Sequence, residues 1–439
     1  MINTKKIKGL NVADWDKRTA TIAGSGPGWL SELRQAGLSR FTESGIPTTK
    51  DEEWKYTNVV ALAERKFSFA AKGDLFEKKE FARYCSDDDI NLVFVNGYLS
   101  EDLSNLRDIP AGVNISTLQE AIRQGDTAVQ EHLTRYETGS TNPFTALNQA
   151  LCDDMPYIKV ADKTVSKKLI HIVHVASFKG KDILLTPRNL IVLGKQSEAN
   201  IMISHISFND DLSYLASSLT DIFLDEQAVL FFCKAQDESQ NAFHIGTTRV
   251  WQERDSNFQG FSQMTGGLVT RNNLDVIING EGANATLDGL YCVNKKQHVD
   301  NHTSVDHRFP NCTSNQLYKG LLNGAARSVF NGKIFVKAIA QKTNSYQLNK
   351  NLLLGTDCRV DTKPQLEIFA DDVKCTHGAT IGQLNEDEIF YLQTRTIPRK
   401  RAINMLSHGF VDDILNTIAS DSVRSKLHIL LEPTFAALE

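Results

Sequence analysis

One short pattern recurs in the middle of the chain: Ser-Glu-Ala-Asn-Ile at 197–201, Asp-Glu-Gln-Ala-Val at 225–229 and Gly-Glu-Gly-Ala-Asn at 280–284. In each copy a small or acidic pair precedes an apolar strand. The first two copies begin 28 residues apart, and the third begins about twice that distance further on. This interval is near the coil length of a β-solenoid, in which each coil stacks on the one before it.

Strand-like runs surround this pattern on both sides. After Pro156 helical periodicity nearly disappears, and short β-rich runs follow one another to the end of the central region. A β-sandwich would need a hairpin turn between most strands, but Asn-Gly or Asp-Gly pairs are few here. The sequence therefore predicts a parallel β-helix (β-solenoid) core over residues 151–395, with a large β-sandwich as the alternative.

Helical periodicity marks the N-terminal part of the chain. Leu30, Leu33 and Leu38 fit one face of a helix, while Ile90–Val95 has the composition of a buried strand. We therefore expect an α-rich N-terminal domain over residues 1–150.

Helical periodicity also returns at the C-terminal end. Strand character is expected to end near Ile389–Leu392, and apolar residues then recur with helical spacing from Arg399 onward. Two helices that meet near Ser420 and Asp421 are predicted, as a C-terminal helical domain over residues 396–439.

Composition excludes several classes of function. The 439 residues carry a net charge of −5, which argues against a broad cationic face for nucleic acid or an anionic membrane. No apolar run approaches the length of a membrane-spanning helix. Seven scattered cysteines indicate a reducing compartment, and the residues after Met1 lack the apolar segment of a signal peptide, so a cytoplasmic location is expected.

The segment Asp-Asp-Val-Lys-Cys-Thr-His-Gly at 371–378 holds the strongest candidate ligands. We expect it to be a strand that ends in a turn at 378–382. Because alternate side chains of a strand share a face, Cys375 and His377 would lie about 7 Å apart and could face a common metal or cluster. One strand supplies at most two ligands, so another segment or subunit must provide the rest. The alternative is a buried thiol beside a hydrogen-bonded imidazole.

A second histidine-rich stretch contains His298, His302 and His307 with Asp300 and Asp306. This set could form a mononuclear metal site with supporting carboxylates. A spacing of five, however, puts His302 and His307 on opposite faces of a strand. Polar side chains hydrogen-bonded along a β-helix ladder are the alternative.

Sequence motifs bear on two enzymatic functions. The chain has no Gly-x4-Gly-Lys-Ser/Thr loop, so we expect it neither to bind nor to hydrolyse ATP by itself. Adjacent acids at 210–211 and 371–372 leave a glycan-active β-helix enzyme as the alternative function, although neighbours on a strand point to opposite faces.

Several motifs resemble the SufB/SufD family of iron–sulfur cluster assembly scaffolds. They are the N-terminal segment Pro-Thr-Thr-Lys-Asp-Glu-Glu-Trp-Lys-Tyr-Thr at 47–57 and an ordered series between 302 and 383. The series includes Tyr-Lys-Gly at 318–320, Arg-Ser-Val-Phe-Asn-Gly-Lys at 327–333, Lys-Pro-Gln-Leu-Glu-Ile at 363–368 and Cys-Thr-His-Gly-Ala at 375–379. The last motif favours the SufD branch over SufB.

This resemblance implies a right-handed parallel β-helix between helical N-terminal and C-terminal regions, and a non-enzymatic subunit of a SufBCD complex. It implies that His377, and with less support Cys375, bind a nascent iron–sulfur cluster shared with SufB. It also implies that the C-terminal helices dock the ATPase SufC, so that Ile403, Leu406 and Phe410 are candidate contacts. Self-association of the isolated chain stays open.

Overall fold

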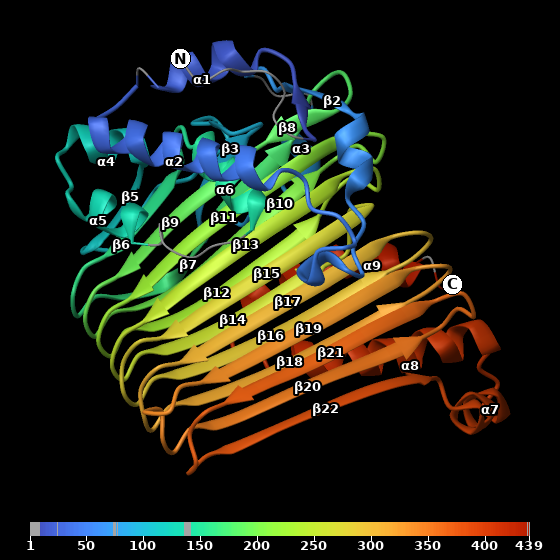
Figure 1. Ribbon diagram of the computed structural model, residues 1–439. Coiled ribbons are helices and arrows are strands. Elements are labelled where there is room, and N and C mark those ends of the chain that lie inside the picture. Colours follow the sequence, from blue (N-terminus) through green and yellow to red (C-terminus); the bar gives the residue numbers. More distant parts are fainter. Residues whose placement is uncertain are drawn as a thin grey trace.

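The computed structural model describes residues 9–23, 25–72, 76, 78–135, 142–436 and 438. These residues form a parallel β-helix with helices at both ends, so the predicted fold class is confirmed (Figure 1). The first residues of the chain, on which the expectation about a signal peptide rests, lie outside the described ranges. Within those ranges, no helix is long and apolar enough to cross a membrane.

Two long sheets form the walls of the β-helix. One has ten strands, which are, from one edge to the other, β22 (Lys374–Gln383), β20 (Asn344–Leu353), β18 (Thr313–Leu322), β16 (Asn284–Val293), β14 (Asn257–Met264), β12 (Val229–Asp237), β10 (Glu198–Ser207), β7 (Val165–Ala176), β3 (Ile90–Val95) and β4 (Tyr98–Leu99). The pairing is parallel throughout, except between β3 and β4.

The other wall is a 12-stranded sheet. Its main path runs through β1 (Asn11–Val12), β2 (Lys66–Phe69), β8 (Ile183–Leu185), β11 (Tyr214–Leu224), β13 (Phe243–Gln252), β15 (Val269–Ile278), β17 (His298–His307), β19 (Arg327–Val336) and β21 (Arg359–Ile368). Three further strands branch from β11: β9 (Arg188–Leu193) pairs with β11, β6 (Pro156–Val160) with β9, and β5 (Val113–Thr117) with β6. From β10 onward, successive strands alternate between the two walls, so each coil adds one strand to each.

The recurring sequence pattern marks the turn that leads into the ten-stranded sheet. At this turn each coil places one residue in the left-handed region, with φ between 55° and 74° at Gln196, Gln227, Asp255, Gly282 and Asn311. Val229 pairs with Asn257, which pairs with Asn284, so these coils contain 28 and 27 residues. The preceding coil contains 31 residues, because Glu198 pairs with Val229. The interval of 28 inferred for that first coil is therefore wrong by three residues.

The inward side chains change from apolar to polar along the β-helix. One row of paired inward positions reads Ile201, Phe232, Gly260, Leu287, Gln316, Gln347 and His377. Its apolar members belong to the main hydrophobic core. The row thus ends in two buried glutamines and a histidine, and the candidate site lies at this polar end of the β-helix.

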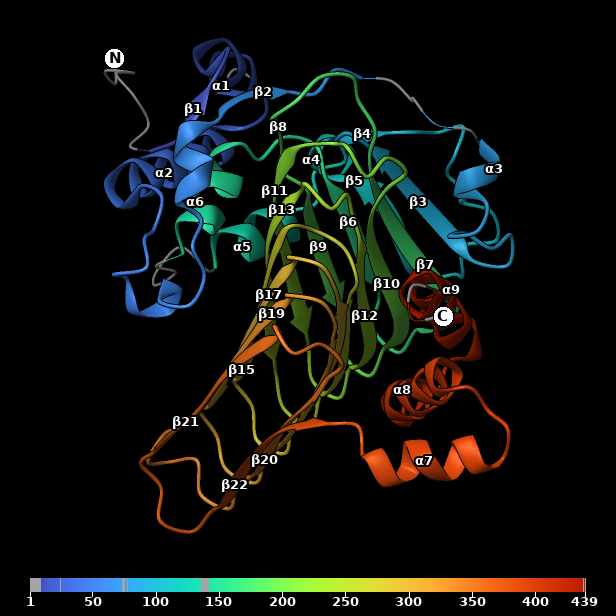
Figure 2. The same cartoon turned by 90° about the vertical axis from the view of Figure 1, so that its right-hand side faces the viewer.

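The N-terminal part packs helices and short strands against one end of the β-helix (Figure 2). The helices are α1 (Trp15–Ala23), α2 (Gly28–Ser44), α3 (Lys78–Phe81), α4 (Leu118–Arg123), α5 (Ala128–Thr134) and α6 (Pro143–Ala150), with 3-10 turns at Glu52–Trp54 and Val60–Glu64. Leu30 and Leu33 are buried on α2, as the periodicity predicts. The predicted buried strand is β3, which extends the ten-stranded sheet beside β7.

Three helices follow the last strand: α7 (Glu386–Thr394), α8 (Arg399–Leu415) and α9 (Asp421–Ala436). The two predicted helices are α8 and α9, which fold back on the outer face of the ten-stranded sheet (Figure 2). The expectation of strand up to Ile389–Leu392 is wrong, because α7 begins there with Asn385 as its cap and three acidic residues in its first turn. The turn expected at 378–382 is also wrong, since β22 pairs with β20 along its whole length.

Candidate functional site

The β-helix is open at its C-terminal end. Among the strands that the structure describes, β21 pairs only with β19, and β22 pairs only with β20. No further coil in the described chain covers their inward faces, so inward residues that are buried in earlier coils become accessible here. Gln347 is fully buried, whereas its neighbour His377 in the last coil is exposed.

Cys375 and His377 lie on the inward face of this last strand. Cys375 is half-buried and packs against the apolar cluster around Ile334 and Ala370 inside the β-helix. His377 follows two residues later, about 7 Å along the strand, and therefore shares that face. Burial raises the pKa of the Cys375 thiol, although a hydrogen bond from the Ser345 backbone works against the shift. The structure therefore places the two side chains on one face of the last strand, at the opening.

This chain offers only part of a metal-binding set. Among the residues that the structure places, no three histidine, cysteine, aspartate or glutamate side chains lie close enough to hold a metal ion together. Iron–sulfur clusters usually take four protein ligands. Two side chains on one strand would therefore need ligands from elsewhere.

Two hydrogen-bonded chains lie beneath these side chains. Under Cys375, the Ser345 hydroxyl lies 2.7 Å from the Ser314 hydroxyl, which lies 2.9 Å from Nε2 of His307. Under His377, Nε2 of Gln347 donates to Oε1 of Gln316 at 3.3 Å, and the Thr303 hydroxyl donates to the same oxygen at 2.7 Å. The floor of the opening is therefore polar and internally bonded.

The histidine-rich strand β17 does not form a metal site. His307 points into the β-helix, where burial lowers its pKa to about 4. His302 lies on the outer face, with Nε2 3.0 Å from Oδ1 of Asp300. Burial alone would lower the pKa of His302, but the Asp300 carboxylate raises it. The structure therefore supports the alternative of hydrogen-bonded polar side chains, with His302 and His307 on opposite faces as expected.

The outer face of β17 holds the N-terminal motif, a role that the sequence did not reveal. The Thr57 hydroxyl donates to Oδ2 of Asp300 at 2.5 Å, and Arg271 donates to the same oxygen at 2.9 Å. The Arg271 guanidinium also stacks 4.0 Å from the Trp54 ring. The side chains of His302 and Arg271 hold the pKa of Asp300 well below its usual value, although burial opposes this. Thr57 and Trp54 of the motif therefore anchor the N-terminal segment to the solenoid.

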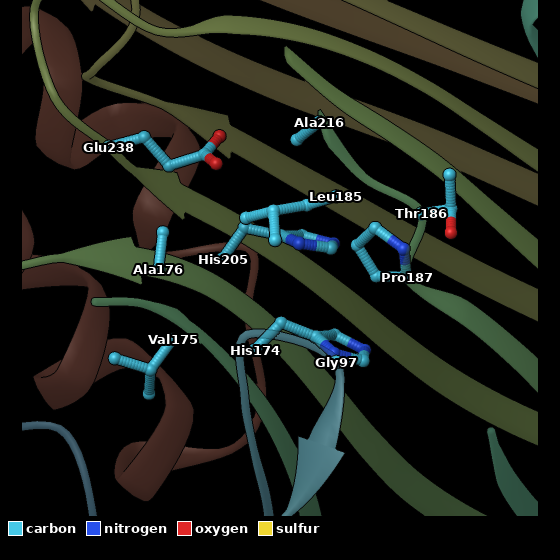
Figure 3. A pocket seen from close by; sticks show the side chains of 10 residues that line it. All are labelled: Gly97, His174, Val175, Ala176, Leu185, Thr186, Pro187, His205, Ala216 and Glu238. Carbon is cyan, nitrogen blue, oxygen red and sulfur yellow. The ribbon is translucent and has the colours of Figure 1, made fainter. Parts of the chain in front are cut away.

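A second buried polar cluster lies near the other end of the β-helix (Figure 3). The His174 and His205 rings stack with centroids 5.0 Å apart beside a cavity of about 20 Å³, large enough for one water molecule. Glu238 accepts a hydrogen bond from Tyr214 at 3.0 Å and lies 2.6 Å from Nδ1 of His244. Burial lowers the pKa of His174 to about 4 and holds that of His205 well below its usual value.

The acidic pairs considered for glycan chemistry are not gathered in a cleft. Residues 210–211 and 371–372 lie in exposed turns of different coils. A groove of about 830 Å³ does exist on the outer face of the 12-stranded sheet, but its acids include Asp275 and Asp306 instead. Asp306 is ion-paired to Arg308 at 2.6 Å. The sequence-based argument for a glycan enzyme therefore has no counterpart in the fold.

The predicted partner-binding residues lie on α8 and are half-buried. Phe410 packs at the edge of the cluster between α8 and the sheet, and its carbonyl accepts a hydrogen bond from Lys319 at 2.9 Å. Ile403 and Leu406 are also partly covered. More exposed apolar side chains lie on the preceding helix α7, where Phe390 is 66% and Tyr391 58% exposed.

Comparison with known proteins agrees with this architecture. Residues 176–410 match the model of the SufBD core domain of the SUF system for FeS cluster assembly, and residues 12–172 match the SufBD protein N-terminal region. The chain is 30% identical to the iron–sulfur cluster assembly protein SufD of Escherichia coli, over 90% of this chain and 91% of the relative. It is 29% identical to a Synechocystis SufBD family protein, over 94% and 92%. It is 25% identical to the chloroplastic protein ABCI7 of Arabidopsis thaliana, over 94% and 87%.

The match covers the helical N-terminal region, both walls of the β-helix and most of α8. The motifs around Trp54 and His377 fall inside the two matched regions. The chain belongs to the SufBD family and takes part in iron–sulfur cluster assembly.

Proposed function

We propose that this chain is the SufD-type scaffold subunit of a SufBCD complex, and that its open β-helix end helps to hold the nascent cluster against SufB. The observation that carries the proposal is the last coil, which presents His377 and Cys375 on an uncovered inward face. The cluster is the cargo of this site. The chain acts by coordination and movement, without turnover or nucleotide binding of its own.

The open end has the properties of a protein interface. The outer edges of β21 and β22 have no neighbour among the described strands, and unpaired strand edges readily pair with another chain. Apolar side chains project from the turns that precede β20 and β22, with Ile339 65% and Phe369 60% exposed. A second β-helix that stacks here would cover both features, as the resemblance to SufB and SufD implies. An isolated chain could also pair with a second copy through this end.

Ligands from SufB would complete the coordination that this chain begins. The resemblance implies that a SufB cysteine faces His377 across the interface. A thiolate and a neutral imidazole must both be free of protons at the metal-binding atom, so we expect assembly to weaken in acid. His377 is the stronger candidate, because its side chain is exposed at the opening, whereas that of Cys375 is half-buried and packs against the apolar cluster inside the β-helix.

The C-terminal helices are the proposed docking site for SufC. Ile403, Leu406 and Phe410 stay candidates, but their partial burial on α8 favours a supporting role. Phe390 and Tyr391 on α7 offer more accessible apolar surface. One ion pair with two hydrogen bonds of 2.7 Å joins Glu386 on α7 to Arg399 on α8. SufC dimerisation on ATP binding would therefore move α7 together with α8 and the sheet beneath, and so open the interface.

Two further predictions belong to this proposal. Residues 1–150 would form an N-terminal domain that stabilises one end of the β-helix. Residues 151–395 would form the core that holds the cluster, and residues 396–439 the domain that docks SufC. The complex would work in the cytoplasm, without nucleic acid or membrane. The first residues of α7 lie inside the central division, so the connection between cluster site and docking unit is short.

The test is co-purification of this chain with SufB and SufC, followed by anaerobic cluster reconstitution monitored by visible absorption. We expect His377→Ala to abolish assembly in a complex that still forms. Thr376→Ala is the matched control, because Thr376 lies between the two candidate ligands on the opposite face of the same strand. A complex indifferent to His377→Ala would remove the proposed ligand, and no complex at all would contradict the scaffold function.

A further inference from the structure

A buried amide lies beneath the proposed ligand His377. Gln347 is fully buried inside the β-helix, and its Nε2 donates to Oε1 of Gln316. Its own Oε1 is also buried and has no hydrogen-bond partner in the described part of the chain. A buried carbonyl oxygen without a donor costs stability, so we expect this atom to accept a hydrogen bond when the site functions.

His377 is placed to supply the missing donor. Gln347 and His377 pair directly across β20 and β22, where strands lie about 4.8 Å apart. Both residues belong to the same inward row. A neutral imidazole has one N–H donor and one bare nitrogen, so it can donate into the β-helix from one side and bind a metal from the other.

We propose that Gln347 is the positioning residue for His377, an inference that rests on the proposed function of His377 as a cluster ligand. The Gln347 Oε1 atom, which has no partner among the described residues, would accept the ring N–H of His377 when that ring turns into the β-helix. This bond selects one tautomer and aims the bare nitrogen out of the opening. Metal-binding histidines commonly donate their other ring N–H to an oxygen acceptor, which orients the ring and raises its basicity.

Gly332 on the opposite wall makes room for this arrangement. A Cβ atom at Gly332 would lie 2.0 Å from Nε2 of Gln347 and 2.6 Å from its amide carbon. Any other residue there would push the amide away from its place under His377. The Thr303 hydroxyl, on the neighbouring strand of that wall, holds the Gln316 oxygen that receives Gln347. The amide is therefore held from two sides.

The first test measures the ring of His377 directly, without a cluster. The full chain is labelled with 15N-histidine, and the His377 ring signals are assigned by their loss in His377→Ala. We expect one tautomer in the wild type, a mixture in Gln347→Met, which has similar length but no acceptor of this strength, and retention in Gln347→Glu. Gly332→Ala should reproduce Gln347→Met, which provides a second route if one variant folds poorly.

The second test measures cluster assembly in the complex with SufB and SufC. Loss of a partner of this kind typically costs 10–100-fold in metal affinity, so Gln347→Met should need at least about tenfold more ferrous iron for half-maximal assembly, and Gln347→Glu should not. If His377→Ala abolishes assembly while Gln347→Met matches the wild type in both tests, the positioning role is refuted and the ligand stands. If His377→Ala has no effect on assembly, His377 is not a cluster ligand and the proposed function of this residue is contradicted.

Discussion

Removing the Asp300 charge should detach the N-terminal motif from the β-helix. The Asp300 carboxylate is 1% exposed and lies within 3.0 Å of the side chains of Thr57, Arg271 and His302. Asp300→Asn keeps the shape but leaves the buried Arg271 without its counter-ion. Breaking a buried ion pair on one side costs about 3–5 kcal/mol, and we expect the lower end because the amide oxygen still accepts a hydrogen bond.

Hydrogen exchange followed by mass spectrometry measures this loss locally. The Thr57 amide donates to the Trp54 carbonyl at 3.0 Å and exchanges only when the segment opens. A loss of about 3 kcal/mol in opening free energy corresponds to a hundredfold or greater increase in exchange rate for a peptide that covers 50–60. The assay is done near pH 7, where the Asp300 carboxylate is charged. Because the pKa of Asp300 is lowered in the fold, its stabilising effect is complete above the unfolded pKa of about 3.9 and is lost only as the pH falls below that value.

Asp361→Asn is the matched control, because Asp361 pairs with Arg359 on the surface of β21 and exposed pairs contribute little. Its exchange over 50–60 should equal that of the wild type. Unchanged exchange in Asp300→Asn would refute the reasoning, since the motif would then be held by its other contacts, such as the Trp54 ring against Arg271 and the ion pair of Glu52 with Lys363.

Three further predictions concern acid stability, docking and packing. Burial holds the pKa of His307 at about 4 against an ordinary 6.5, so the contribution of this residue to stability should fall by about 3 kcal/mol as pH drops from 6.5 to 4. His307→Gln should reduce the acid slope of the melting temperature accordingly, and equal slopes would contradict it. Replacing Phe390 and Tyr391 together by serine should reduce SufC retention in a pull-down without lowering the melting temperature, and full retention would exclude α7 from the docking site. Gly289→Ala should cost about 1–3 kcal/mol, since its Cβ would lie 2.2 Å from a buried tyrosine ring, whereas Gly382→Ala has open space and should melt like the wild type.

Much of the fold could be predicted because its signals are local. Each coil turns at one residue in the left-handed region, and the recurring pattern around Gln227 and Gly282 follows from that requirement. The face shared by Cys375 and His377 also follows from the twofold period of a single strand. The boundary near Ile389 was missed because a short apolar run has the same composition in a strand and in a helix, and the cap at Asn385 decided the outcome.

The surroundings of the candidate site could not be predicted in the same way. Gln347 lies 30 positions before His377 in the chain, and its place beneath that ring depends on the exact length of one coil. For the coil between Glu198 and Val229, the interval between the repeated sequence patterns differs from the true coil length by three residues. An error of one residue in the register between coils would turn every inward side chain outward. A sequence pattern of this kind therefore cannot predict which side chains of neighbouring coils are in contact.

The sequence by itself therefore determined the fold class, the helical ends and the strand that carries Cys375 and His377, because turn preference and strand alternation act within a few residues. Only the tertiary structure decided that this strand is the last coil, that its inward face is uncovered, and that Thr57 reaches Asp300 across 243 positions of the chain. The physical reason is that pairing between coils and the closing of the N-terminal segment onto β17 depend on the summed geometry of all the residues between them.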